Sequence, residues 1–280
     1  MLRICLLGWL LFQTGSAWAL RPVAKWWAKP DTLGLKYEPL TLTTPDQYQL
    51  ASWLIAPAST ATDQHTTMVL ACGDAGNMAS NLFEANALSR AGYRVLLFDY
   101  RGFGHSQAFP IDPNRLYYQE FVTDLRTALA AARQRFPHQR TGIIGYSMGT
   151  LLGAEVAATT RCDFLITDGY VGNPQATVTR ILAKSHQVVT IPAEAAAYSQ
   201  AAARINCPWL LIAGTEDQNT PLADSIAAVK AAKRRQQRQL LTVKCGHLRA
   251  AETLTDKEYG DLYARAISQF LAGEQVVSKS

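Results

Sequence analysis

The sequence predicts an α/β domain whose mostly parallel sheet carries helices on both faces. Three observations predict this class: short, nearly continuous apolar segments recur along the chain, stretches with helical periodicity separate them, and 48% of the 280 residues are hydrophobic. Strands that are buried on both faces of a parallel sheet have this apolar character. One sheet of this type can organise about 250 residues, so a single large core accommodates the chain.

The N-terminus has the layout of a secretory signal peptide. Arg3 precedes an apolar segment at residues 4–12, and the small-residue site Ala17-Trp18-Ala19 follows, so we expect cleavage after Ala19. An apolar segment of this length is shorter than the roughly 17 to 25 residues that cross a membrane. The sequence therefore predicts an exported protein, periplasmic or secreted. An uncleaved N-terminal membrane anchor is the alternative, because residues 17–20 lengthen the apolar stretch.

Residues 20–35 form an N-terminal extension that mixes aromatic and basic side chains. Trp26 and Trp27 lie between Lys25 and Lys29. Such a segment can rest on a membrane surface, which predicts peripheral membrane contact through the two tryptophans. The alternative is that it packs onto the domain or remains loose.

The net charge of +5 comes from 27 Lys and Arg against 22 Asp and Glu, and it is dispersed. One basic run stands out at residues 233–238, on the exit of an expected helix, where a solvated face explains it. We therefore expect no nucleic-acid partner.

Eight strands are predicted. The first two form an antiparallel hairpin at residues 36–43 and 48–56 around a turn at 44–47. The apolar segments that follow lie at residues 67–72, 94–100, 141–146, 163–168, 208–214 and 238–244. Because helical stretches separate these segments, we expect parallel strands joined by crossovers.

Helices are predicted between the strands. One begins after Asn114, a candidate N-cap, and its apolar residues recur at helical spacing as far as Ala132. Another spans residues 254–271. The Ala-rich insertion at 172–206 is expected to form two short helices that make a small cap over a site; an ordinary, longer crossover is the alternative. The predicted domain covers 36–273, with a C-terminal tail at 274–280.

A sharp turn between an expected strand and an expected helix contains the most informative motif. Gly145-Tyr146-Ser147-Met148-Gly149 matches G-x-S-x-G. Ser147 must adopt a strained backbone there, and the flanking glycines let the strand and the helix approach each other. Its hydroxyl would protrude at the carboxyl edge of the sheet, and the helix N-terminus would face a developing oxyanion. A glycine-rich turn with an incidental serine is the alternative.

A serine hydroxyl needs a neighbouring base before it can act as a nucleophile. Of the five histidines, only His247 follows the last expected strand, where folds with a turn of this type carry the base. The acid that orients this base should follow a strand near the same edge. Asp217 is favoured because it directly follows the strand at 208–214, whereas Asp168 and Glu216 are the weaker candidates.

Taken together, these motifs resemble the α/β-hydrolase family, and within it the monoacylglycerol-lipase and serine-aminopeptidase-like branch. The resemblance covers residues 37–270 and includes the loop Asp99-Tyr100-Arg101-Gly102-Phe103-Gly104-His105-Ser106 and the segment Gly73-Asp74-Ala75-Gly76-Asn77-Met78. It implies the α/β-hydrolase fold, a triad of Ser147, Asp217 and His247, and an oxyanion hole made by the backbone N–H groups of Asp74 and Met148. No metal or organic cofactor is implied.

The chain departs from the family pattern at Cys72 and Asp74. The family commonly has His-Gly after the third strand, and this chain has Cys72-Gly73. A carboxylate at Asp74 would oppose a developing oxyanion, because stabilisation there depends on donors and positive potential. Either the Asp74 side chain turns away while its N–H faces the site, or the site is impaired. We interpret Cys72 as a small buried residue.

A disulfide is one interpretation of two further cysteines. Cys162 and Cys207 each lie six residues before the end of consecutive strands that the fold would make parallel neighbours. Adjacent strands lie about 4.8 Å apart, within the reach of a disulfide. Two independent buried thiols are the alternative. The cysteine spacing fits no zinc pattern.

The sequence therefore predicts an exported serine hydrolase that cleaves acyl esters or thioesters and uses no cofactor. A small-molecule acyl compound is the expected partner. A non-catalytic binding protein on the same fold and a serine peptidase are the alternatives.

Overall fold

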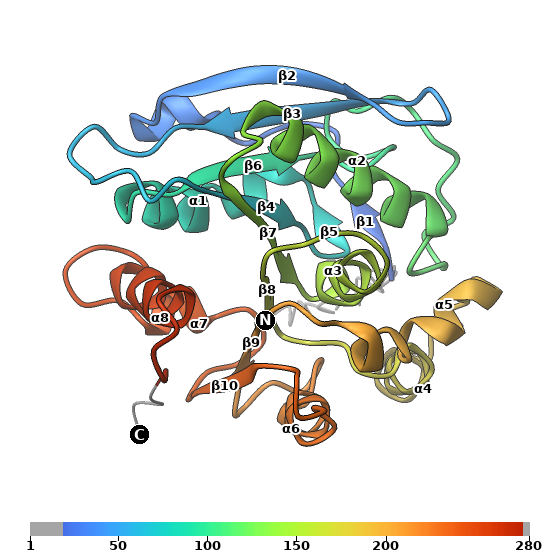
Figure 1. Cartoon of the computed structure of the whole chain (residues 1–280). Coiled ribbons are helices and arrows are strands. Elements are labelled where there is room, and N and C mark those ends of the chain that lie inside the picture. Colours follow the sequence, from blue (N-terminus) through green and yellow to red (C-terminus); the bar gives the residue numbers. More distant parts are fainter. Residues whose placement is uncertain (1–18, 277–280) are drawn as a thin grey trace, which may run out of the picture.

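An eight-stranded sheet forms the centre of the protein in a computed structural model that describes residues 19–276 (Figure 1). The strand order is β10-β9-β8-β7-β4-β6-β3-β2. The strands are β2 (Tyr37–Thr43), β3 (Gln49–Ile55), β4 (Thr66–Ala71), β6 (Arg94–Phe98), β7 (Arg140–Tyr146), β8 (Leu165–Asp168), β9 (Trp209–Gly214) and β10 (Arg238–Val243). β3 is antiparallel to β2 and β6, and every other pair of neighbours is parallel. The predicted fold class is confirmed.

The parallel strands form where the sequence is apolar on both faces. Every residue of β4, β8 and β9 is buried, because helices cover both sides of the sheet. The register aligns Ala71 at the end of β4 with Gly145 of β7, and Tyr146 with Asp168 at the end of β8. The loops that follow these strands consequently leave the sheet at one common edge, where ligands bind in folds of this type.

Helices cover the two faces of the sheet. In Figure 1, α1 (Leu82–Arg90) and α8 (Asp261–Leu271) lie on one face, and α2 (Gln119–Arg135) and α3 (Met148–Thr159) lie on the other. α6 (Leu222–Lys230) packs against β9 and β10, and the short α7 (Ala250–Thr253) precedes α8. The hydrophobic core lies between these helices and the sheet.

Two of the expected helix boundaries are wrong. α2 begins at Gln119 and not after Asn114, because the N–H of Asn114 donates to the Asp112 side chain in a turn and Tyr117 has a φ of 58°. Of the helix expected over 254–271, only α8 at Asp261–Leu271 forms; residues 254–260 are a loop, and α7 ends before them at Thr253. Gly260 adopts the left-handed region, and the Asp261 carboxylate accepts hydrogen bonds from the backbone of the loop before it.

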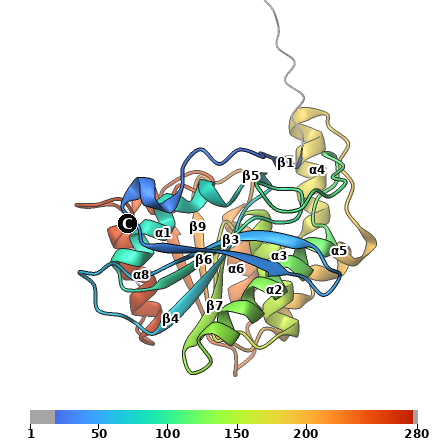
Figure 2. The ribbon, with the colours of Figure 1, turned by 90° about the horizontal axis from the view of Figure 1, so that it is seen from above.

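The insertion between β8 and β9 forms the two short helices that the sequence predicted. They are α4 (Pro174–Ser185) and α5 (Ala193–Tyr198), followed by the 3-10 helix η3 (Ala201–Arg204). Pro174 is the one buried residue of α4. Figure 2 shows α4 at the side of the molecule where β1 (Arg21–Pro22) enters the fold. α4 therefore packs loosely onto the domain, as a cap does, whereas α5 and η3 pack against α3 through buried residues.

The N-terminal extension is held against the domain. β1 pairs in parallel with β5 (Ala75–Gly76), and the 3-10 helices η1 (Pro30–Leu33) and η2 (Met78–Asn81) follow these two strands. Trp26 donates its indole N–H to Asp99 at 2.8 Å, and its ring stacks on His105 at 3.6 Å. Trp26 is thus partly buried against the domain, whereas Trp27 stays 55% exposed.

The predicted signal peptide falls mostly outside the described residues, which begin at Ala19. Among residues 19–276, no helix combines the length and the hydrophobicity that a membrane span requires.

Candidate active site

Ser147 lies in a strained turn between β7 and α3. Its φ of 49° and ψ of −115° are unusual for a residue with a side chain, and such strain is often found at functional sites. The turn needs its glycines: a Cβ on Gly149 would lie 2.1 Å from the carbonyl oxygen of Ala71, and one on Gly145 would lie 2.5 Å from that of Gly149. The strained turn expected at this motif is therefore present.

The structure brings Ser147, His247 and Asp217 together at the carboxyl edge of the sheet. His247 Nε2 lies 3.0 Å from Ser147 Oγ, and His247 Nδ1 lies 2.8 Å from Asp217 Oδ2. The three residues follow β7, β10 and β9, so the topology places them at one edge of the sheet, and their loops bring the side chains together across β8. Both distances lie within hydrogen-bonding range, and each imidazole nitrogen faces one partner.

The carboxylate of Asp217 is held by the loop that it begins. The backbone N–H groups of Asn219 and Thr220 donate to Oδ1 at 2.8 and 3.0 Å, and the Thr220 hydroxyl donates to Oδ2 at 2.6 Å. Burial alone would raise the pKa of Asp217, but hydrogen bonds from His247 and Thr220 lower it to about 2. Asp217 is therefore ionised at neutral pH and can hold a charged imidazole.

Sequence reasoning did not single out Thr220. Its hydroxyl also lies 3.3 Å from His247 Nδ1, so it contacts both members of the pair. The available signal was the spacing, since a hydroxyl three residues after an aspartate is typical of a loop that binds its own carboxylate.

The weaker candidates for the acid lie elsewhere. Glu216 is exposed. Asp168 is buried at the end of β8, where its backbone carbonyl accepts a hydrogen bond from the N–H of Ser147 at 3.1 Å. Burial raises the pKa of Asp168 to about 7. Of the other histidines, His105 packs under Trp26, and His65, His138 and His186 are exposed.

The two expected oxyanion donors, Asp74 and Met148, flank Ser147. The N–H of Met148 has no hydrogen-bond acceptor in the part of the chain that the structure describes. Gly73 lets the chain that follows β4 lie close to Ser147, since a Cβ built on Gly73 would lie 3.5 Å from the Cβ of Ser147. The backbone before Asp74 is therefore in contact with the residue that carries the hydroxyl.

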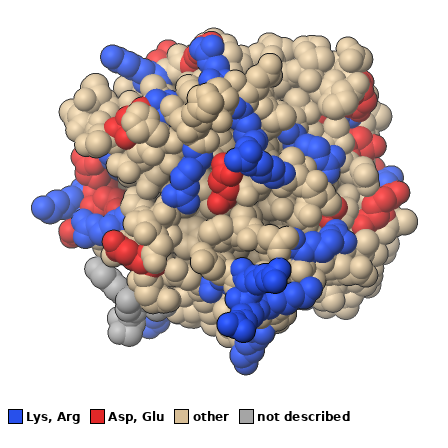
Figure 3. Space-filling model, in the orientation of Figure 1, with Lys and Arg blue, Asp and Glu red and all other residues tan. Residues whose placement is uncertain are grey.

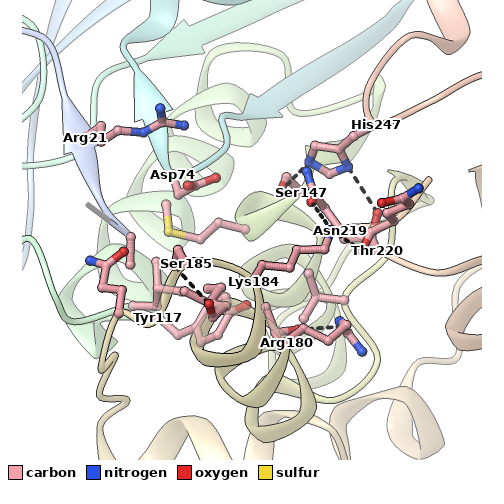
Figure 4. Close-up of a pocket in the computed structure, with 18 residues that line it drawn as sticks. Arg21, Asp74, Tyr117, Ser147, Arg180, Lys184, Ser185, Asn219, Thr220 and His247 are labelled. Carbon is pink, nitrogen blue, oxygen red and sulfur yellow. Dashed lines mark hydrogen bonds between the residues drawn. The ribbon is translucent and has the colours of Figure 1, made fainter. Parts of the chain in front are cut away.

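The side chain of Asp74 does not turn away from the site. It lines the same cavity as Ser147, and Figure 4 shows it between Arg21 and Ser147. Burial raises the pKa of Asp74, while its own backbone N–H, Arg21 and His247 act in the opposite direction. A carboxyl group thus faces the space in which an oxyanion would form.

A cavity of about 330 Å³ opens above Ser147 and His247. The N-terminal extension, the loop around Tyr117, α4 and the loop at 218–220 form its walls. Its apolar lining includes Leu116, Met148, Val171 and Ile181, and Arg21, Arg180 and Lys184 contribute positive charge. The cavity can accept a small ligand, and the extension and the cap both contribute to it.

The disulfide expected between Cys162 and Cys207 is absent, and both cysteines are free thiols. The two thiols nevertheless interact. The Cys207 side chain raises the pKa of the Cys162 thiol, and burial adds to that effect. Cys72 is buried as expected, and burial raises the pKa of its thiol.

Within residues 19–276, no group of His, Cys, Asp and Glu side chains is arranged to hold a metal ion.

Basic side chains gather over α6 and the turn that follows it (Figure 3). Lys230, Lys233, Arg234 and Arg235 are exposed there, as expected for a solvated face. Arg238 differs, because it is half-buried and donates to the carbonyl oxygens of Ala202 and Ala228. None of these residues lines the cavity above Ser147.

Comparison with known proteins agrees with this geometry. A family model described as alpha/beta hydrolase fold matches residues 66–179. An esterase from Pyrococcus furiosus superposes with a TM-score of 0.73 at 19% identity, over 92% of this chain and 98% of that one. A serine hydrolase without a lid from Xanthomonas campestris gives a TM-score of 0.54 at 19% identity, over 76% of this chain and 86% of that one. The chain therefore has the α/β-hydrolase fold, and its resemblance to that family is confirmed.

Other similar proteins include a peptidase and two proteins described as uncharacterized. An acylaminoacyl peptidase from Pyrococcus horikoshii gives a TM-score of 0.62 at 14% identity, over 88% of this chain and 42% of that one. The uncharacterized protein YfhR of Escherichia coli K12 is 33% identical over 40% of this chain and 38% of its own length. An uncharacterized membrane protein of Saccharomyces cerevisiae is 33% identical over 29% of this chain and 28% of its own length. The chain thus matches well under half of these two relatives.

Proposed function

We propose that the protein is an exported serine hydrolase that cleaves acyl esters or thioesters. One observation carries the proposal: an unbroken line of hydrogen bonds joins Ser147 Oγ, the two ring nitrogens of His247 and the Asp217 carboxylate at the base of a cavity. A serine that lacks such a base is a weak nucleophile, and this arrangement supplies one.

The reaction begins when His247 Nε2 accepts the proton of Ser147 as Oγ attacks the acyl carbonyl carbon. Asp217, held ionised by its hydrogen bonds, stabilises the imidazolium that results and keeps Nδ1 protonated. The N–H groups of Met148 and Asp74 receive the carbonyl oxygen as it becomes an oxyanion, and the N-terminus of α3 adds positive potential.

His247 then returns its proton to the leaving alcohol or thiol, which departs and leaves an acyl group on Ser147. A water molecule repeats the sequence: His247 removes its proton, the hydroxide adds to the acyl carbon, and Ser147 leaves with a proton from His247. All of these proton transfers use one imidazole.

Esters and thioesters are favoured over peptides by the form of the cavity. It is bounded by a small cap and the N-terminal extension, and its volume of about 330 Å³ suits a compact ligand. Esters and thioesters also carry better leaving groups than amides, so a single open pocket is sufficient for them. The esterase and serine hydrolase among the similar structures agree with this choice, and the acylaminoacyl peptidase keeps the peptidase alternative open to test.

A fluorophosphonate probe gives the most direct test, because it labels an activated serine whatever the natural substrate is. We expect labelling of Ser147 and its loss in Ser147→Ala, together with a fall in ester hydrolysis of roughly 10⁴-fold or more. The matched control is Ser80→Ala, which changes a serine that does not line the cavity. An unlabelled but folded wild-type protein would reject the proposal.

A binding protein without catalytic activity is the second candidate, and the position of Asp74 is the observation that favours it. A negative charge beside the oxyanion donors opposes the charge that develops in the reaction. In that case Ser147 would remain unlabelled while small acyl compounds still bound in the cavity. Protection of the protein against thermal unfolding by short-chain esters or acids, without turnover, distinguishes this function from the first.

A further inference from the structure

The charged side chains around the cavity are mostly positive. Three cationic side chains line it, Arg21, Arg180 and Lys184, and Asp74 is the one carboxyl group among the lining residues. Polar side chains that include Thr177, Gln187, Gln218 and Asn219 occupy much of the remaining wall. The cavity therefore offers apolar surface to an acyl chain and, beside it, partners for a charged group.

Two of the three cations have an acidic neighbour. Arg180 lies 3.9 Å from the Asp224 carboxylate and donates to the Thr177 hydroxyl at 2.9 Å. Arg21 lies near Asp74 and acts to lower the pKa of that carboxyl group. Their charges are therefore partly offset within the protein.

Lys184 has no such neighbour. Its ammonium group donates to the carbonyl oxygen of Gln218 at 3.2 Å and to the side-chain oxygen of Asn219 at 3.4 Å, both of which are neutral acceptors. Among the described residues, no carboxylate lies within salt-bridge distance of it. One positive charge at the cavity is thus left without a counter-charge.

The uncompensated charge of Lys184 lies on the side of the cavity where the reaction would occur. Figure 4 shows Lys184 extending from α4 toward Asn219, on the side of Ser147 and His247, with Arg21 beyond Asp74 on the other side. Asn219 is next to Thr220, which contacts His247 Nδ1 at 3.3 Å. A ligand bound against Ser147 therefore shares the cavity with this ammonium group.

We propose that the substrate of this site is an ester or thioester that carries a carboxylate, and that Lys184 binds this carboxylate. The inference rests on the proposed hydrolase function. The ammonium group can exchange two long hydrogen bonds to neutral oxygens for a charge-assisted bond to an anion, which is shorter and stronger. The single uncompensated positive charge of Lys184 matches a substrate with one negative charge. A cleft lined by positive charge also concentrates anions.

The test compares matched pairs of esters with the purified full-length protein. The first pair is the para-nitrophenyl monoester of glutaric acid and para-nitrophenyl valerate, which differ in a carboxylate on the acyl side. The second pair is 4-acetoxybenzoate and methyl 4-acetoxybenzoate. Cleavage of the acetate is compared, so these two compounds differ in a carboxylate on the alcohol side. We expect kcat/KM to favour the anionic member of at least one pair, by roughly five- to tenfold.

Three variants connect that preference to Lys184. Lys184→Met should abolish it, Lys184→Glu should reverse it, and Lys184→Arg should retain most of it. Lys230→Met is the matched control, because Lys230 is an exposed lysine near the end of α6 that does not line the cavity. The preference should also weaken as salt is raised, since ions screen an exposed charge.

The outcomes separate this proposal from the one on which it rests. Equal hydrolysis of both members of each pair, or a preference that survives in Lys184→Met, overturns the carboxylate inference while the hydrolase function stands. If neither member of either pair is cleaved and the fluorophosphonate does not label Ser147, the hydrolase function itself fails, and this inference fails with it.

Discussion

The hydroxyl group of Thr220 lies 2.6 Å from the Oδ2 atom of Asp217, the same oxygen that faces His247. Thr220 therefore fixes the direction from which the carboxylate meets the imidazole, without contacting Ser147. This makes it a positioning residue in the proposed reaction. Its loop, which also supplies two backbone donors, holds Asp217 in one orientation.

Replacing Thr220 by valine keeps the shape and removes the hydroxyl. Because a hydrogen bond to a charged group contributes about 1.5–3 kcal/mol, we expect Thr220→Val to lower kcat by roughly tenfold or more with little effect on KM. Thr220→Ser should recover most of the loss. Steady-state kinetics on one neutral ester provide the measurement. Equal rates for wild type and Thr220→Val, or a serine variant as impaired as the valine variant, would contradict this role.

Arg101, in the loop that follows β6, forms a buried ion pair with Asp124 of α2. Their exposed fractions are 1% and 0%, and Arg101 Nη2 lies 2.7 Å from Asp124 Oδ1. Arg101→Met leaves the carboxylate buried without its partner, which costs about 3–5 kcal/mol. Urea denaturation should show this decrease in the free energy of unfolding.

The control for Arg101 is a pair of the same type at the surface. Arg135 and Glu38 are 58% and 50% exposed, so Arg135→Met should cost less than about 1 kcal/mol. The double variant Arg101→Met with Asp124→Leu should recover much of the stability, because no buried charge remains. A loss as small for Arg101→Met as for Arg135→Met would rule out this account.

The sheet could be predicted from the sequence because its strands carry an unambiguous pattern. The apolar segment expected at 141–146 corresponds to β7 at Arg140–Tyr146, and the one at 208–214 to β9 at Trp209–Gly214. Once those strands are parallel, their ends must meet at one edge. The placement of Ser147, Asp217 and His247 at one edge therefore follows from topology, whereas the distances between them depend on the loops that carry them.

Features that depend on contacts between distant segments could not be predicted in the same way. β1 and β5 are two residues long, so neither carries a periodic signal, and their pairing is visible only in space. Trp26 resembled a surface aromatic because the sequence does not show that Asp99 would accept its N–H. The same applies to Lys184, whose importance depends on how α4 folds over a loop that lies 34 residues further along the chain.

Asp168 should make stability depend on pH. Burial raises its pKa from 3.8 to about 7, so between about pH 4 and pH 7 the folded protein binds a proton that the unfolded chain has released. Stability from this group is therefore complete below about pH 4 and is lost as the pH rises to about 7. Asp168→Asn removes the titration and should gain stability over wild type as the pH increases.

The measurement for Asp168 is the difference in Tm between Asp168→Asn and wild type at pH 4 and pH 8. A pKa raised from 3.8 to about 7 corresponds to about 4 kcal/mol over this range. Because each kcal/mol moves Tm by roughly 2–4 °C in a chain of this size, we expect the difference to grow by roughly 10 °C. Glu274→Gln, at an exposed position near the end of the described chain, should show no such trend. A difference that is the same at both pH values would exclude Asp168 as the titrating group.

Asp74→Asn provides the test of whether the cavity carboxyl group restrains catalysis. Burial raises the pKa of Asp74, so the group is neutral at low pH and becomes a negative charge beside the oxyanion as the pH rises. A unit charge roughly 6 Å from an oxyanion, at an effective dielectric constant of about 40, changes the barrier by about 1.4 kcal/mol, which is about tenfold in rate. The ratio of kcat/KM for Asp74→Asn to that for wild type should therefore increase with pH, toward roughly tenfold at alkaline pH.

The control is Asp256→Asn, which changes an exposed aspartate outside the cavity lining and should keep a ratio near one at every pH. If the Asp74→Asn ratio is flat across the pH range, the carboxyl group does not act on the oxyanion, and the reason to consider a silenced site disappears.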